Sequence, residues 1–495
     1  MKNSSEEMAA ESGDEQGQES SHAMRRKLGL RDLVPMQILL VVGITWAGTA
    51  SKQGGTHLWF WLVAILTLFV PLAAVVGWCA KVWPLEGGVY QWTKFALGPF
   101  AGFMSAWNFG MWALLCVSNI GIMTATSLSY GLGQRAAWMK NSHSLIIELS
   151  VGLFLLILAV NLPGFGLGRW VSHFGTAVMV LVTALMMGLL FIHPHASAAH
   201  PHVNPQAPFS LAMPALTLFS INIFTKIAFN ALTGLEQVAV FAGETRDAGR
   251  TILRSAWIAA PIIAMIYILM TGSMLAYIPA AKVDLTGPIP QLLAVAFGGA
   301  AAGGGIDWGL MLGRATILAL AFALVAQYAV LVSETSRLPL VAGWDGIVPK
   351  WFTRLDPRWR TPTRSLAVIV LAAIAMGVLA TSGGTGAQEA FQLIVTCGNI
   401  FYGIYYTMMF AIPLVVGGRF GVRAGFWLKL AAVSGITITL LAMGFNLMPI
   451  VDVASRWGFA AKVTGVSLAM NLLGIAIYWN GTRNRVQREL DQSAE

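Results

Sequence analysis

Long apolar segments follow one another through nearly the whole chain, and they limit most strongly what it can fold into. Each has roughly the 17 to 25 residues that a helix needs to cross a bilayer. Apolar residues make up 56% of the 495 positions, and charged residues make up only 11%. A soluble domain has about 25% charged residues, so this chain has too little polar surface to cover itself in water. We therefore predict an all-α integral membrane protein.

Twelve transmembrane helices are predicted from the apolar segments. Their approximate bounds are 33–52, 58–79, 100–130, 145–161, 170–192, 214–241, 252–279, 311–335, 364–382, 389–416, 425–447 and 460–480. Residues 1–31 are rich in Ser, Glu and Gly, and we expect a disordered cytoplasmic tail there. Residues 481–495 are expected to form a second cytoplasmic tail.

Lys and Arg residues are distributed unevenly between the predicted loops. With the N-terminus inside, the cytoplasmic side carries roughly three times as many basic residues as the outer side, as the positive-inside rule requires. We therefore expect a multi-pass protein of the inner (plasma) membrane with both termini in the cytoplasm. The net charge of +9 then faces the cytoplasmic leaflet, and no nucleic-acid partner is needed to explain it.

Two predicted helices contain residues that weaken a helix at mid-membrane depth. The first contains Gly43 and Gly48, and the sixth contains Asn230, Thr233 and Gly234. Gly destabilises a helix by about 1 kcal/mol relative to Ala. Unwound backbone is tolerated at this depth only where it is buried in protein or lines a wet cavity. We predict that both helices are interrupted; the alternative is that the glycines merely allow close helix packing.

Interrupted helices five spans apart are typical of transporters built from an inverted repeat. This pattern predicts a transport core over 32–416, with five helices in 32–192 and five in inverted orientation in 214–416. Helices 1 and 6 are the broken ones, and two accessory helices follow over 417–480. In such a core, exposed N–H groups bind a carboxylate and exposed carbonyls bind a cation or an ammonium group, which suits a zwitterion.

Short motifs stand in a fixed order between the predicted helices. They are Pro84-Leu85-Glu86-Gly87-Gly88-Val89-Tyr90, Phe229-x4-Gly234-x-Glu236, Gly243-Glu244-Thr245-Arg246-Asp247 and Asp345-Gly346-Ile347-Val348-Pro349-Lys350. In these residues the chain resembles the amino acid–polyamine–organocation (APC) superfamily, over nearly its whole length outside the tails. The resemblance implies a secondary active transporter, a symporter or antiporter, that moves an amino acid by alternating access. The chain departs from the superfamily at Trp46, where the first helix usually has Gly-Ser-Gly or a close relative.

The substrate site is expected where the two breaks meet. Residues 43–49 are expected to supply donors for a carboxylate, and residues 229–234 carbonyls for an amino group. Trp46 and Phe229 are candidate apolar gates, and Asn230 and Thr233 are candidate side-chain ligands. The full set of candidates is Gly43, Ile44, Thr45, Trp46, Ala47, Gly48, Thr49, Lys226, Phe229, Asn230, Ala231, Leu232, Thr233, Gly234, Trp112, Gln327 and Asn399.

Lys226 is a charged residue within the sixth predicted span, about one helical turn or roughly 5 Å before the second break. A charge within a span is costly unless it faces a cavity or a partner. Four roles remain open for the Lys226 side chain. It could bind an acidic substrate, replace a coupling cation, reach outward to water, or pair with a carboxylate such as Glu148 or Glu236. Lys226, Glu236 and Glu244 are candidate gating or coupling residues. For Glu236 we favour a structural hydrogen bond over proton transport.

Other kinds of chemistry find little support in the sequence. The segment His193–His202 has no acidic or cysteine companions, so we expect an external loop and no metal site. No phosphate-binding loop or nucleophile–base pair is present, so we expect neither an enzyme nor a cofactor.

Several alternatives remain open. The coupling ion is H⁺ or Na⁺, or the protein is an exchanger. The substrate is an amino acid, or else a polyamine or another organic amine. A non-transporting nutrient sensor and an integral-membrane enzyme are alternatives from other classes. The expected partners are a small-molecule substrate and the lipid bilayer, and the oligomeric state is left open.

Overall fold

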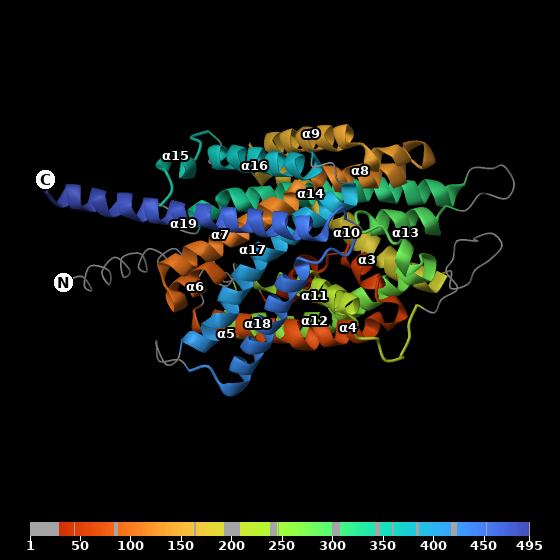
Figure 1. The fold of residues 1–495 in the computed structure, drawn as a ribbon, viewed down its shortest axis with the longest axis horizontal. Coiled ribbons are helices and arrows are strands. Elements are labelled where there is room, and N and C mark those ends of the chain that lie inside the picture. Colours follow the sequence, from red (N-terminus) through yellow and green to blue (C-terminus); the bar gives the residue numbers. More distant parts are fainter. Residues whose placement is uncertain are drawn as a thin grey trace.

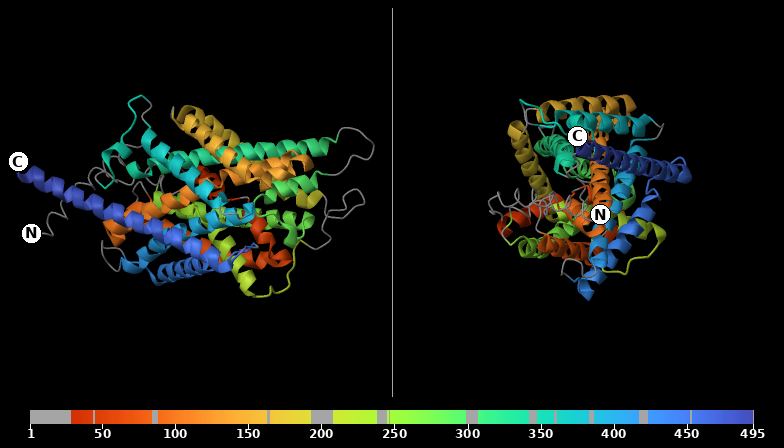
Figure 2. Two further views of the ribbon diagram at one scale, coloured as in Figure 1. Left: turned by 45° about the horizontal axis from the view of Figure 1, so that its top comes forward. Right: turned by 90° about the vertical axis from the view of Figure 1, so that its left-hand side faces the viewer.

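The protein is a bundle of helices, most of which run along the long axis of the molecule (Figure 1). The two further views show the same arrangement from other sides (Figure 2). Eleven candidate spans in the described residues are long and apolar enough to cross a membrane, which agrees with the predicted class. The computed structural model describes residues 29–43, 45–83, 88–162, 165–192, 208–237, 245, 247–298, 307–341, 347–358, 361–382, 386–416, 423–451 and 453–494.

The first predicted span is divided into two short helices and is not one of these eleven. Helix α2 covers Leu30–Val41 and helix α3 covers Trp46–Ser51. Val42 ends α2 in an extended conformation, with φ −76° and ψ 95°. The helix is therefore interrupted at the residues that the sequence pattern indicated.

The sixth predicted span is interrupted in the same way. Helix α11 covers Leu218–Leu232, and Thr233 follows in an extended conformation. Gly234 has φ +107°, a backbone conformation that residues with a Cβ rarely adopt. A short 3₁₀ turn over 235–237 follows. Gly234 thus provides the backbone conformation that interrupts the helix at this break.

The remaining helices are continuous apart from a few short turns between them. Their bounds are α4 (His57–Ala64), η2 (Ile65–Phe69), α5 (Val70–Val82), α6 (Val89–Leu97), α7 (Pro99–Ser118), α8 (Ile120–Gly131), η3 (Gln134–Asn141), α9 (His143–Asn161), α10 (Phe165–Ile192), α12 (Ala248–Tyr277), α13 (Pro288–Ala296), α14 (Trp308–Val341), α15 (Lys350–Thr353), α16 (Thr363–Ser382), α17 (Ala387–Val415), α18 (Phe426–Asn446) and α19 (Arg456–Ala494).

Three details differ from the predicted spans. The span at 100–130 consists of α7 and α8, which meet at Asn119. The short helix α13 occupies a segment in which no helix was predicted. Helix α19 continues to Ala494, well past residue 480, and extends beyond the bundle in Figure 2. The histidine segment His193–His202 lies outside the described residues.

The largest buried apolar cluster surrounds the two broken helices. Its members include Trp61, Leu72, Phe229, Tyr267 and Phe410, which come from five different helices. Large apolar side chains on the outside of the bundle are exposed, as expected of a surface that faces lipid. The buried cluster therefore fixes the two breaks side by side, in the interior.

Helix α3 packs closely against the start of α13 at Gly48. A Cβ at this position would overlap the ring of Pro288. We predict that Gly48→Ala destabilises the protein by about 1–3 kcal/mol, because the proline ring cannot yield as a flexible side chain would. Thermal unfolding of the purified protein measures this. Gly152→Ala is the matched control, since a Cβ there meets nothing within 4 Å. Equal melting temperatures for the two variants would contradict the close contact.

Candidate functional site at the two helix breaks

One tyrosine hydroxyl connects the two breaks. Tyr267, on α12, is fully buried. Its hydroxyl oxygen lies 2.9 Å from the carbonyl oxygen of Val41 and 2.9 Å from that of Ala231, and it accepts a hydrogen bond from the N–H of Gly43 at 2.9 Å. The ring of Trp61 stacks on it, with 4.5 Å between ring centroids. Tyr267 thus pairs with backbone groups that the ends of α2 and α11 leave without helical partners.

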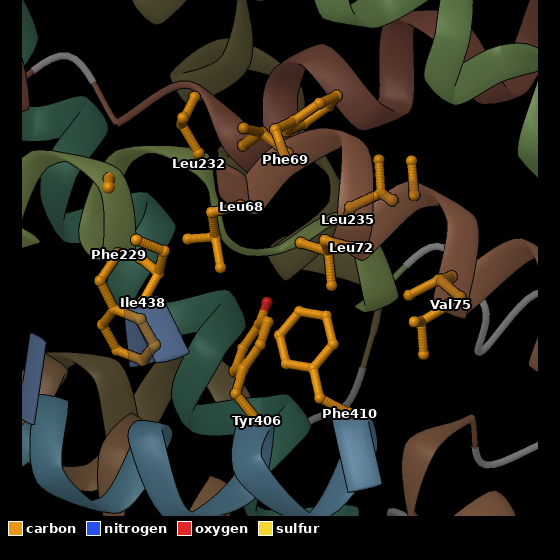
Figure 3. Packing of buried hydrophobic residues seen from close by; sticks show 14 of the residues in the cluster. Leu68, Phe69, Leu72, Val75, Phe229, Leu232, Leu235, Tyr406, Phe410 and Ile438 are labelled. Carbon is orange, nitrogen blue, oxygen red and sulfur yellow. The ribbon is translucent and has the colours of Figure 1, made fainter. Parts of the chain in front are cut away.

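A second set of contacts, around the carboxylate of Glu236, stabilises the second break. Glu236 is buried, and it accepts hydrogen bonds from the hydroxyl of Tyr402 at 2.7 Å and from the hydroxyl of Tyr406. The N–H of Gly234 lies 3.1 Å from the same carboxylate and 2.9 Å from the Tyr406 oxygen. Figure 3 shows Tyr406 reaching from α17 toward the segment that carries Leu235. These contacts are of the structural kind that the sequence analysis favoured for Glu236.

Lys226 has a different partner from those that the sequence suggested. Its side chain is buried, and its Nζ donates a hydrogen bond to Asn446 Oδ1 at 3.0 Å. Asn399 Nδ2 donates to the same oxygen at 3.2 Å. Among the described residues no carboxylate forms an ion pair with Lys226, so neither Glu148 nor Glu236 is its partner.

The predicted residues of the first break are buried or half-buried around it. Trp46 covers the break, because its indole is so close to Gly43 that a Cβ there would overlap it. Thr45 borders a small cavity together with Ser127 and Thr286. Ala47, Gly48 and Thr49 are buried in α3. Ile44 lies outside the described residues, as does Glu244.

The predicted residues of the second break mostly engage their own helix. Thr233 Oγ1 donates to the carbonyl of Phe229 at 2.6 Å, and Asn230 Nδ2 donates to the carbonyl of Lys226 at 2.9 Å. The ring of Phe229 packs edge-on against Tyr402 and Tyr406. Ala231 contributes its carbonyl to the contact with Tyr267, and Leu232 is buried.

The three candidates from other helices are placed differently. Trp112, on α7, stacks on Tyr402 with 4.2 Å between ring centroids. Asn399 joins the Lys226 contact described above. Gln327 is exposed on α14, so the structure does not bring it together with the buried groups at the breaks.

Four side chains that contact the candidate site were not predicted from the sequence, namely Tyr267, Tyr402, Tyr406 and Asn446. One signal was available: Tyr402 and Tyr406 are four residues apart and therefore share a helix face. Polar groups at membrane depth are also expected to face protein rather than lipid. No local pattern indicates which backbone groups these side chains reach.

A polar cluster closes the bundle next to α13. Asp284 forms an ion pair with Lys140 at 3.1 Å and accepts hydrogen bonds from Tyr130 at 2.9 Å and from Thr286 at 2.6 Å. Burial alone would raise the pKa of Asp284. The hydrogen bond from Thr286, followed by the charge of Lys140, outweighs burial and holds this pKa below its usual value.

The lowered pKa of Asp284 makes a prediction about acid stability. The pKa of Asp284 is lower in the folded than in the unfolded protein. Ionised Asp284 therefore stabilises the folded state fully at any pH above its pKa in the unfolded protein, and this stabilisation is lost as pH falls through its pKa in the folded protein. We expect the wild-type protein to have a higher melting temperature than Asp284→Asn at pH 7. This difference in melting temperature should shrink below about pH 4. Thermal unfolding as a function of pH measures it.

The exposed Asp247, which pairs with Arg250 on the surface, offers a matched control. Asp247→Asn is expected to change the melting temperature little at any pH, since exposed ion pairs contribute little. Equal melting temperatures for wild type and Asp284→Asn at pH 7 would contradict the prediction.

Comparison with known proteins agrees with the membrane architecture. Residues 28–469 match the family model described as amino acid permease. The chain is 24% identical to an uncharacterised transporter of Mycobacterium tuberculosis, over 95% of this chain and 94% of the relative. It is 25% identical to the low-affinity putrescine importer PlaP of Escherichia coli (80% and 79%). It is also 25% identical to the branched-chain amino acid permease BcaP of Bacillus subtilis (75% and 80%).

The fold is also similar to that of a solved structure. MhsT in complex with L-phenylalanine superposes with a TM-score of 0.51, over 84% of this chain and 97% of MhsT, at 12% sequence identity. At this identity the likeness concerns the fold alone. The family match spans nearly all of the helical bundle, and the relatives named above are transporters and not enzymes. The chain therefore belongs to the amino acid permease family, within the APC superfamily.

Proposed function

We propose that the protein is a secondary active transporter that moves an amino acid across the inner membrane by alternating access, with its substrate bound between the two breaks. The observation that carries the proposal is the contact of one hydroxyl, that of Tyr267, with the backbone of both breaks. Because of this contact, the backbone of the first break and the backbone of the second break lie close enough together for one small molecule to bind both. Backbone groups at broken helices are the usual ligands in transporters of this architecture.

The electrostatics of the breaks suit a zwitterion. Helices α2 and α11 both end at a break, and the C-terminal end of a helix carries partial negative charge, which favours an ammonium group. Helix α3 begins at the first break, where N–H groups favour a carboxylate. Residues 43–49 and 229–234 are therefore the proposed substrate site.

Two contacts hold the helices together at the end that carries α13. Gly48 packs on Pro288, and Asp284 bridges to Lys140. We assign this end to the outside, because the loops at the opposite end carry most of the basic residues and are therefore expected in the cytoplasm. Alternating access then requires that these contacts separate.

A polyamine is the second candidate substrate. The sequence similarity to the putrescine importer PlaP favours it. A dication would need acidic side chains in the site. The one described carboxylate at the breaks, that of Glu236, is occupied by Tyr402 and Tyr406, and Lys226 adds positive charge nearby. An amino acid is therefore the better fit.

Uptake into proteoliposomes tests the proposal. Radiolabelled amino acids and putrescine are offered under imposed Na⁺ gradients, imposed H⁺ gradients, or with internal substrate for exchange. Accumulation of an amino acid supports the proposal, and the effective gradient identifies the coupling. Accumulation of putrescine alone would favour the second candidate. A folded protein that accumulates none of these under any gradient would contradict transport and favour a sensor.

Tyr267→Phe tests the contact between the breaks. Loss of the hydroxyl leaves buried backbone groups unpaired, at a cost of about 1–3 kcal/mol, so we expect uptake to fall by about tenfold or more. Tyr277→Phe is the matched control: it lies on the same helix and is also buried, but its hydroxyl donates to Leu189, away from the breaks. Equal uptake by the two variants would show that the Tyr267 hydroxyl is dispensable.

A further inference from the structure

A buried polar cluster lies between α11, α17 and α18, outside residues 43–49 and 229–234 of the proposed substrate site. It consists of Lys226, Asn399 and Asn446, whose relative exposures are 4%, 3% and 1%. We call it the Lys226 cluster. Helix α18 packs against both α11 and α17 (Figure 1). The cluster therefore connects the broken helix α11 to a helix of the predicted accessory pair.

Hydrogen-bond donors outnumber acceptors in the Lys226 cluster. The Lys226 ammonium group has three N–H donors, and one of them reaches Asn446 Oδ1. That oxygen also accepts a hydrogen bond from Asn399. Asn446 Nδ2 has no hydrogen-bond partner among the described residues. The cluster thus has a positive charge and unused donors, and one of its two amide oxygens, Asn446 Oδ1, is already shared by two donors.

The charge of the cluster is not balanced within the described part of the chain. No carboxylate there forms an ion pair with Lys226. A buried ion without a counter-charge costs several kcal/mol, and a charge at membrane depth usually faces a partner or a cavity. A buried amide N–H₂ group without an acceptor adds to this cost. A water molecule would pair the donors but would not neutralise the charge, whereas an anion would do both.

We propose that the Lys226 cluster binds a small anionic group, held by Lys226 Nζ and Asn446 Nδ2. Lys226 Nζ lies 3.0 Å from the oxygen of the same amide group that carries the unpaired Nδ2, so the two donors are close enough for one anion to contact both. Two sources supply this chemistry, a free halide ion or a carboxylate on the substrate. In either case the anion fastens the first part of α11 to α18, and so holds the second break in place. The proposal concerns binding and does not depend on transport.

The melting temperature of the purified full-length protein tests the anion site. It is measured in sodium chloride and in sodium gluconate at equal ionic strength, without substrate. We expect chloride to raise the melting temperature in a saturable way, by about 2 °C or more, because a ligand stabilises the folded state that binds it. Lys226→Met removes the charge and should abolish the rise. Lys462→Met, at an exposed lysine of α19, should retain it.

Asn446→Asp provides a second, independent variant. A carboxylate at this position supplies the missing counter-charge inside the protein. The variant should therefore be as stable in gluconate as wild type is in chloride, and its melting temperature should not respond to chloride. A full chloride effect in Asn446→Asp, or in Lys226→Met, would overturn the proposal.

Glutamate and glutamine distinguish the two sources of the anion. If chloride has no effect but glutamate stabilises wild type more than glutamine does, and Lys226→Met loses this difference, the bound anion is the side-chain carboxylate of the substrate. If wild type responds neither to chloride nor to glutamate over glutamine, the proposal is wrong. This test measures stability and not uptake. If an anion stabilises a protein that takes up no substrate, the anion site is supported while the transport function is contradicted.

Discussion

Two helices end in the interior of the bundle, and the tyrosine hydroxyl groups that pair with their exposed backbone are the interactions on which the rest of the structure depends. A backbone group without a partner is far more costly in a membrane than at a wet surface. The Tyr267 hydroxyl accepts a hydrogen bond from the N–H of Gly43, and its single proton can be donated to the carbonyl of Val41 or to that of Ala231, each 2.9 Å away. Because one side chain serves both breaks, the breaks are held at a fixed distance from each other.

The second break depends on a separate set of contacts. Gly234 turns the chain with a positive φ angle, and its N–H points to Glu236 and Tyr406. Glu236 follows the break directly and Tyr406 lies on α17, so α17 supports the end of α11. Movement of α17 relative to α11 would have to disturb a buried carboxylate. The network therefore links the position of α17 to that of the proposed substrate site.

The sequence was informative about the breaks and much less so about their partners. Gly43 and Gly234 weaken their helices locally, so both interruptions could be predicted from neighbouring residues. Gly48 instead lies inside α3 and allows close packing against Pro288. The contact between Gly43 and Tyr267 joins residues 224 positions apart, and no periodic pattern encodes such a distance. Lys226 was recognised as unusual, and a carboxylate was the partner expected for its charge. Its partner is instead the amide of Asn446, 220 positions away in the sequence.

An experimental structure with a transported amino acid bound tests the central claim most directly. The account predicts that the carboxylate of the ligand lies against residues 43–49 and its amino group against residues 229–234, with the Tyr267 hydroxyl still in contact with both breaks. A ligand bound away from the breaks, or either helix found continuous through Gly43 or Gly234, would contradict it.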